Sequence, residues 1–96
     1  MVNLEYLKQY HSIKDVVDII DEIEKLDYLI FQNDWNAVSQ HIQEVSSKHP
    51  VEAGVYNAVR IPAQTIQDAA AACRQFLLAL GAEKITKELS KHSGGN

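Results

Sequence analysis

The stretch from Ser12 to Gln32 constrains the fold most, because its apolar residues recur with the period of an α-helix. Successive spacings of three or four residues place them in one stripe, which consists of Val16, Ile19, Ile23, Leu26 and Ile30. This pattern predicts one amphipathic helix over residues 12–32, with Ser12 and Asp15 as a capping-box-like start. Such a helix cannot bury its apolar stripe alone, so the remaining chain must pack against it.

A second long helix is predicted over residues 34–47. Its apolar residues have the same period, and they are Trp35, Val38, Ile42 and Val45. Asn33 or Asp34 can cap it, and Trp35 is expected to bury its ring against Ile30 or Phe31. The polar break before it is typical of the turn in an antiparallel helical hairpin.

The C-terminal third of the chain carries a further helical stripe over residues 62–80. Its members are Ile66, Ala70, Cys73, Leu77 and Leu80. Gly81 suits the left-handed position that ends many helices, so we expect a separate short helix over residues 83–92 with Ile85 and Leu89 as its anchors. Residues 3–10 predict a short first helix capped by Asn3.

Together these segments predict an all-α protein, an up-and-down helical bundle of three main helices plus short terminal helices. A chain of 96 residues with 46% apolar residues suits one modest core, so residues 1–92 are expected to form a single domain. Residues 93–96 are predicted to be a flexible tail.

Charge and composition narrow the classes of partner. Nine basic and 13 acidic residues give a net charge of −4, and the basic residues are scattered, which argues against nucleic acid. No apolar run approaches the length that spans a bilayer, and charges throughout the first twenty residues give no sign of a secretory signal. With Cys73 as the only cysteine, an intramolecular disulfide is excluded.

The chain offers no recognisable catalytic constellation. His41 and Glu44 share a helix face, but two ligands do not close a metal site. Cys73 lies on an apolar stripe and is interpreted as a core residue. Asp27 projects near the middle of the first stripe, so its carboxylate must be paired, capped or near the exposed helix end, and Arg60 is a candidate partner. We accordingly predict a protein that is not an enzyme and that holds no cofactor or metal.

Two groups of residues are candidates for protein contacts. One is aromatic and basic: Tyr56 and Arg60 lie four residues apart in the segment Val51–Ile61, which has apolar residues without a clean period, and Tyr6 and Tyr10 can add to an aromatic patch. The other is acidic and is predicted to be either a solvated face or a surface for a basic partner. It consists of Asp15, Asp18, Asp21, Glu22 and Glu24.

Residues of the predicted hairpin resemble those of PsbQ-like extrinsic subunits of photosystem II. The matching residues are Ile23, Leu26, Ile30, Asp34, Trp35, Val38 and Ile42. The resemblance implies a helical bundle that docks on the lumenal side of a photosystem, and hence a place in the thylakoid lumen, with the cytoplasm as the expectation otherwise. Colicin-type and pediocin-type immunity proteins are similar in size, acidity and helix content.

Three functional classes follow from these observations. The first is a non-enzymatic subunit that docks on a larger protein assembly, with a photosystem as one such assembly. The second is an acidic inhibitor or immunity-type protein that binds a basic protein. The third, an enzyme or cofactor protein, requires a polar pocket that the sequence does not supply.

Overall fold

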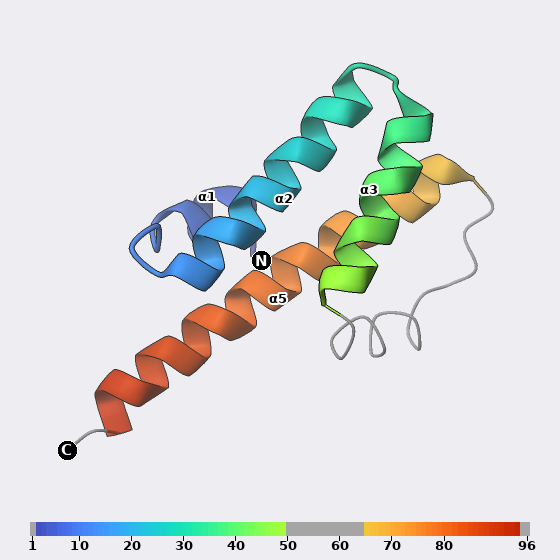
Figure 1. Ribbon diagram of the computed structural model, residues 1–96. Coiled ribbons are helices and arrows are strands. Elements are labelled where there is room, and N and C mark those ends of the chain that lie inside the picture. The colour runs from blue at the N-terminus through green and yellow to red at the C-terminus, as the bar shows by residue number, and fades with distance from the viewer. Residues whose placement is uncertain (1, 50–64, 95–96) are drawn as a thin grey trace.

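The computed structural model describes residues 2–49 and 65–94, and within these ranges the protein consists of four helices. They are α1 (Leu4–Lys8), α2 (Lys14–Phe31), α3 (Trp35–Lys48) and α5 (Ile66–Gly94). α2 and α3 form an antiparallel hairpin, and α5 crosses both of them while α1 lies against α2 and α5 (Figure 1). The predicted all-α helical bundle is confirmed.

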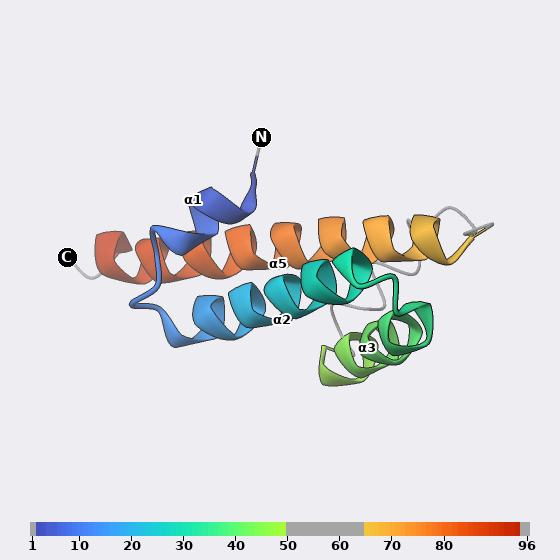
Figure 2. The same cartoon turned by 90° about the horizontal axis from the view of Figure 1, so that it is seen from above.

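Viewed from above, α5 forms the long axis of the molecule, with α1 on one side of it and α2 on the other (Figure 2). α2 contacts each of the other three helices. This is the arrangement expected of the helix with the most regular apolar stripe, because that stripe needs partners along its whole length.

α2 begins two residues later than the sequence predicted. Its N-cap is Ile13, which makes no side-chain capping bond, so the expected capping role of Ser12 is wrong. Ser12 instead belongs to the turn between α1 and α2, where the Ile13 N–H donates to the carbonyl of Tyr10. Asn3, by contrast, caps α1 as predicted, since its side-chain oxygen accepts from the Tyr6 N–H at 3.0 Å.

The turn between α2 and α3 follows the expected chemistry. Asn33 has a φ of 56°, a left-handed conformation that asparagine tolerates better than most residues. Asp34 then caps α3, because its carboxylate accepts from the Ala37 N–H at 3.2 Å. Trp35 packs against the core as predicted, but Phe31 is 81% exposed and therefore is not its buried partner.

α5 is one continuous helix, which corrects the prediction of a helix end at Gly81. Gly81 does not adopt the left-handed conformation, and it lies buried inside the helix against α1. A Cβ atom there would stand 2.8 Å from Cδ1 of Leu7, so the missing side chain allows α1 to approach α5 closely. Tertiary packing, rather than a helix end, accounts for this glycine.

The core lies where α2, α3 and α5 meet, with Leu7 of α1 added to it. Its largest fully buried side chains are Leu7, Ile19, Ile23, Leu26, Leu77, Ile85, Val16, Val38 and Cys73. The predicted core positions Ile23 and Leu77 are therefore confirmed. Leu89, which we expected to be an anchor, is 46% exposed, and the C-terminal turns of α5 extend beyond the other helices in Figure 1.

Candidate functional site

A buried carboxylate joins α2 to the end of α3. Glu22 was expected on the solvated face of α2, but it is buried because α3 packs over that flank of the helix. Its carboxylate accepts from Nε2 of His49 at 3.1 and 3.2 Å and faces Nζ of Lys48 at 3.1 Å. This contact raises the pKa of Lys48, first through the hydrogen bond and then through the negative charge. The Lys48 ammonium and the His49 N–H offset the desolvation of one buried carboxylate.

His41 makes a second bond across the same interface. Its Nε2 lies 2.9 Å from the backbone carbonyl oxygen of Glu22, which can only accept, so Nε2 carries the proton. The opposite ring nitrogen, Nδ1, has no hydrogen-bond partner within the described part of the chain. It lies 3.7 Å from Oε2 of Glu44. The packing thus fixes the orientation of the ring.

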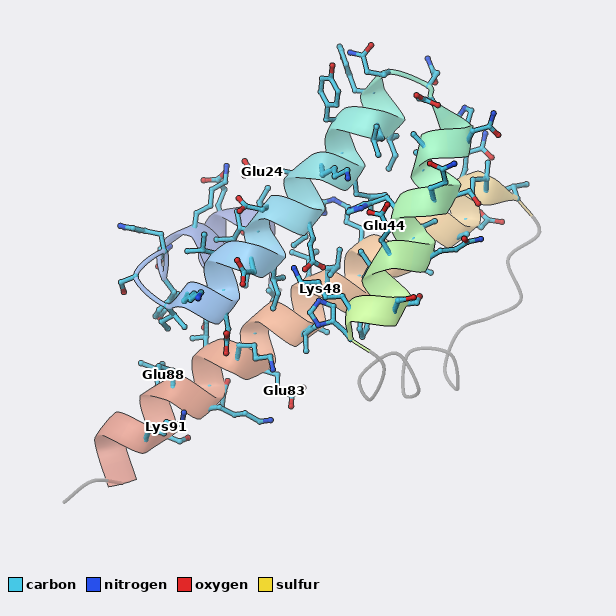
Figure 3. All side chains as sticks on the ribbon, viewed as in Figure 1. Glu24, Glu44, Lys48, Glu83, Glu88 and Lys91 are labelled. Atoms are coloured by element: carbon cyan, nitrogen blue, oxygen red, sulfur yellow. The ribbon has the colours of Figure 1, made fainter. Side chains whose placement is uncertain are left out.

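A hollow of about 260 Å³ adjoins this cluster at the surface between α2 and α3. It is lined by Asp18, Asp21, Glu22, Lys25, His41, Glu44, Val45 and Lys48. Two of the lining residues, Lys25 of α2 and Glu44 of α3, form a salt bridge at 3.7 Å. Figure 3 shows Glu44 and Lys48 on α3, with Lys48 at the C-terminal end of the helix. The hollow combines a buried imidazole with several carboxylates.

The outer face of α2 carries a stripe of exposed side chains that consists of Asp21, Glu24, Tyr28 and Phe31, hereafter the outer stripe. Spacings of three, four and three residues align them along one side of the helix. Tyr28 is 62% exposed and Phe31 81% exposed, so two aromatic rings face solvent at the end of α2 next to the hairpin turn. The sequence reading missed this pair, although both residues fall outside the apolar stripe of α2.

Two of the four predicted contact residues can be located. Tyr6 and Tyr10 are half-buried and pack against the core, and their ring centroids lie 5.4 Å apart. They therefore form a tilted aromatic pair at the α1 end of the bundle. Tyr56 and Arg60, together with the whole segment Val51–Ile61, lie outside the described residues.

Asp27 has a different partner from the one the sequence suggested. Its two carboxylate oxygens accept from Nε and Nη2 of Arg74 at 2.8 and 3.1 Å, which gives a bidentate ion pair between α2 and α5. Hydrogen bonding to Asp27 raises the pKa of Arg74. Arg60, the predicted candidate, lies outside the described part of the chain. The Asp27 carboxylate is nevertheless paired, one of the predicted alternatives.

Cys73 is buried in the core, as predicted. Burial raises the pKa of its thiol from 9.0 to about 11, and the negative charge of Glu22 adds to the effect. At neutral pH the side chain is therefore a thiol, whereas nucleophilic cysteines react as thiolates. Cys73 serves packing in this structure.

Within residues 2–49 and 65–94, no three His, Cys, Asp or Glu side chains are grouped so as to hold a metal ion. Across the same ranges, no helix combines the length and the apolar character that crossing a bilayer requires. Comparisons of the chain with protein-family models, with curated proteins and with solved structures found no match.

Proposed function

We propose that this protein is a non-enzymatic helical-bundle subunit that docks on a larger protein assembly through the outer stripe of α2. The main support for this proposal is the exposure of the Tyr28 and Phe31 side chains. Aromatic side chains bury much apolar area and are enriched among the residues that dominate binding energy. Burying each ring on a partner contributes roughly 1.5–3 kcal/mol.

The outer stripe also indicates the chemistry of the partner surface. Asp21 and Glu24 precede the two aromatic rings on the same side of α2, and Glu24 lies 3.5 Å from Lys8 of α1. An apolar depression bordered on one side by basic residues would complement this order of side chains. A photosystem is one assembly that the resemblance to PsbQ-like subunits implies, and it remains a prediction from those residues.

A second candidate, the acidic inhibitor or immunity-type protein, is favoured by a separate observation. Asp15, Asp18 and Asp21 follow one another along α2, and none of them forms an ion pair with another described residue. Carboxylates that form no ion pair within the described part of the chain attract a basic protein and accelerate its association. In this case charge, rather than aromatic burial, would dominate the binding energy.

Affinity purification from the cells that express the protein separates the two candidates. Tyr28→Ser with Phe31→Ser should abolish recovery of the partner, while Leu89→Ser, which alters an exposed apolar residue on α5, should leave it unchanged. Both proteins should melt like the parent, because none of these three side chains is buried. Recovery that survives the aromatic substitutions but is lost with Asp15→Lys and Asp18→Lys would favour the acidic inhibitor. Recovery that survives both pairs of changes would contradict both candidates.

A further inference from the structure

The hollow between α2 and α3 contains an acceptor that lacks a donor. His41 is only 4% exposed, and its Nε2–H is committed to the carbonyl oxygen of Glu22. In the neutral ring Nδ1 is then an acceptor, and no described residue donates to it. Buried acceptors are normally paired, and leaving one unpaired is costly. A ligand with an N–H or O–H donor would therefore be stabilised by a hydrogen bond to Nδ1 of His41.

The net negative charge around the hollow favours a cation as the ligand that supplies this donor. The carboxylate of Glu22 is occupied by Lys48 and His49. The lining holds four carboxylates, which belong to Asp18, Asp21, Glu22 and Glu44, against the two ammonium groups of Lys25 and Lys48. Lys25 pairs with Glu44, and Lys48, which pairs with Glu22, also interacts with the charges of Asp18 and Asp21. An anion in this position would meet an excess of negative charge, whereas a cationic donor gains charge-assisted hydrogen bonds.

We propose that this hollow binds a cationic group with several N–H bonds, an alkylammonium or a guanidinium. Nδ1 of His41 and Oε2 of Glu44 lie 3.7 Å apart. One ammonium nitrogen, or two adjacent N–H groups of a guanidinium, spans two acceptors at this separation with ordinary hydrogen-bond lengths. The cation would donate to His41 and pair with Glu44, with Asp18 and Asp21 supplying further negative charge.

Lys25 pairs with Glu44 at the hollow in the unbound protein. Its ammonium lies 3.7 Å from the same Glu44 oxygen, and the side chains of Lys25 and Glu44 are 56% and 64% exposed. Surface side chains of this kind exchange partners at little energetic cost. The incoming cation therefore takes the place of Lys25 beside Glu44 and gains access to Nδ1.

The inference goes beyond the proposed function, because it requires no contact with the outer-stripe aromatics Tyr28 and Phe31. A free amine and a lysine or arginine side chain of another protein share the chemistry that the hollow recognises. Titration with methylguanidinium and with a capped Ala-Arg-Ala peptide distinguishes these sources. Tighter binding of the peptide indicates a protein side chain, and tighter binding of the free cation indicates a small amine. Both results depend on binding of the cation in the hollow between α2 and α3.

The test is a titration of the intact protein followed by the nitrogen resonances of His41. Before ligand is added, His41 should be neutral with its proton on Nε2. Methylguanidinium should then shift the Nδ1 resonance in the direction expected for a nitrogen that accepts a hydrogen bond. Tetramethylammonium, which has the same charge and no N–H donor, should leave it in place. Equal shifts with both cations, or a free protein in which Nδ1 is already protonated at neutral pH, would overturn the proposal.

Two exposed substitutions test the assigned geometry, and a third is the matched control. Glu44→Gln should weaken methylguanidinium binding about two- to fivefold, the range of one partly exposed ion pair, and Lys25→Met should tighten it by a similar factor. Glu83→Gln, on the C-terminal half of α5 (Figure 3), should change nothing. Lys25→Met that binds no more tightly than the parent, or Glu44→Gln that binds equally well, would contradict the assigned geometry.

Discussion

Replacing Gly81 with alanine should destabilise the protein, although alanine is the better helix former. The added methyl group would stand 2.8 and 2.9 Å from the two terminal carbons of Leu7. Leu7 is fully buried, so it cannot move into solvent to relieve the contact. Overpacking of this kind costs about 1–3 kcal/mol. The helix propensity of alanine offsets about 1 kcal/mol of that, which leaves a net loss of about 0–2 kcal/mol.

The same substitution should have the opposite sign once Leu7 is shortened. Leu7→Ala alone should cost about 2–5 kcal/mol, because it leaves a cavity against α5. In that background the methyl group at position 81 meets no terminal leucine carbons, so Gly81→Ala should gain about 1 kcal/mol from propensity alone. A change of sign between two backgrounds identifies direct contact, since independent sites contribute additively.

Urea unfolding followed by circular dichroism of the four proteins measures this cycle. Ala79→Gly, at an exposed position two residues earlier in α5, reports the propensity difference in the same helix and should cost about 1 kcal/mol in both backgrounds. If Gly81→Ala stabilised the parent and the Leu7→Ala variant equally, α1 would not approach α5 at this point.

Two further predictions follow from the core. Ile23→Ala and Leu77→Ala should each cost about 2–5 kcal/mol in the free energy of unfolding, because both side chains are fully buried, whereas Leu89→Ala should cost far less; equal melting temperatures for the three would contradict the burial. The raised pKa of Cys73 means that the unfolded chain loses the thiol proton near pH 9 while the folded chain keeps it until about 11. Stability should therefore fall over this range by about 2–3 kcal/mol more in the parent than in Cys73→Ala, and parallel pH profiles would refute this linkage.

The helices themselves could be predicted because their apolar periodicity is a local property. The stripe from Val16 to Ile30 specified α2, and the polar break at Asn33 and Asp34 specified the hairpin turn. The error at Gly81 arose because one residue type serves two purposes. Gly81 was interpreted as a helix end because glycine commonly occupies that position, but close packing of Leu7 also requires glycine.

The candidate site was less predictable, because its contacts join residues distant in sequence. Glu22 meets His49 across 27 positions, and Asp27 meets Arg74 across 47. Periodicity shows that such polar residues flank an apolar stripe, but it does not show which helix covers them. The exposure of Tyr28 and Phe31 could have been predicted from the helical period, since both residues lie outside the apolar stripe of α2.

Site-directed photo-crosslinking tests the proposed docking surface most directly. A photoreactive phenylalanine analogue is placed at position 31 in one protein and at position 89 in another, and each is irradiated in the cells that express the chain. Phe31 is 81% exposed on the outer stripe and Leu89 is 46% exposed on α5, so both probes are open to solvent in the isolated protein. We expect position 31 to yield one defined adduct with a second protein and position 89 to yield none. No adduct at position 31, or the same adducts from both positions, would contradict docking through α2.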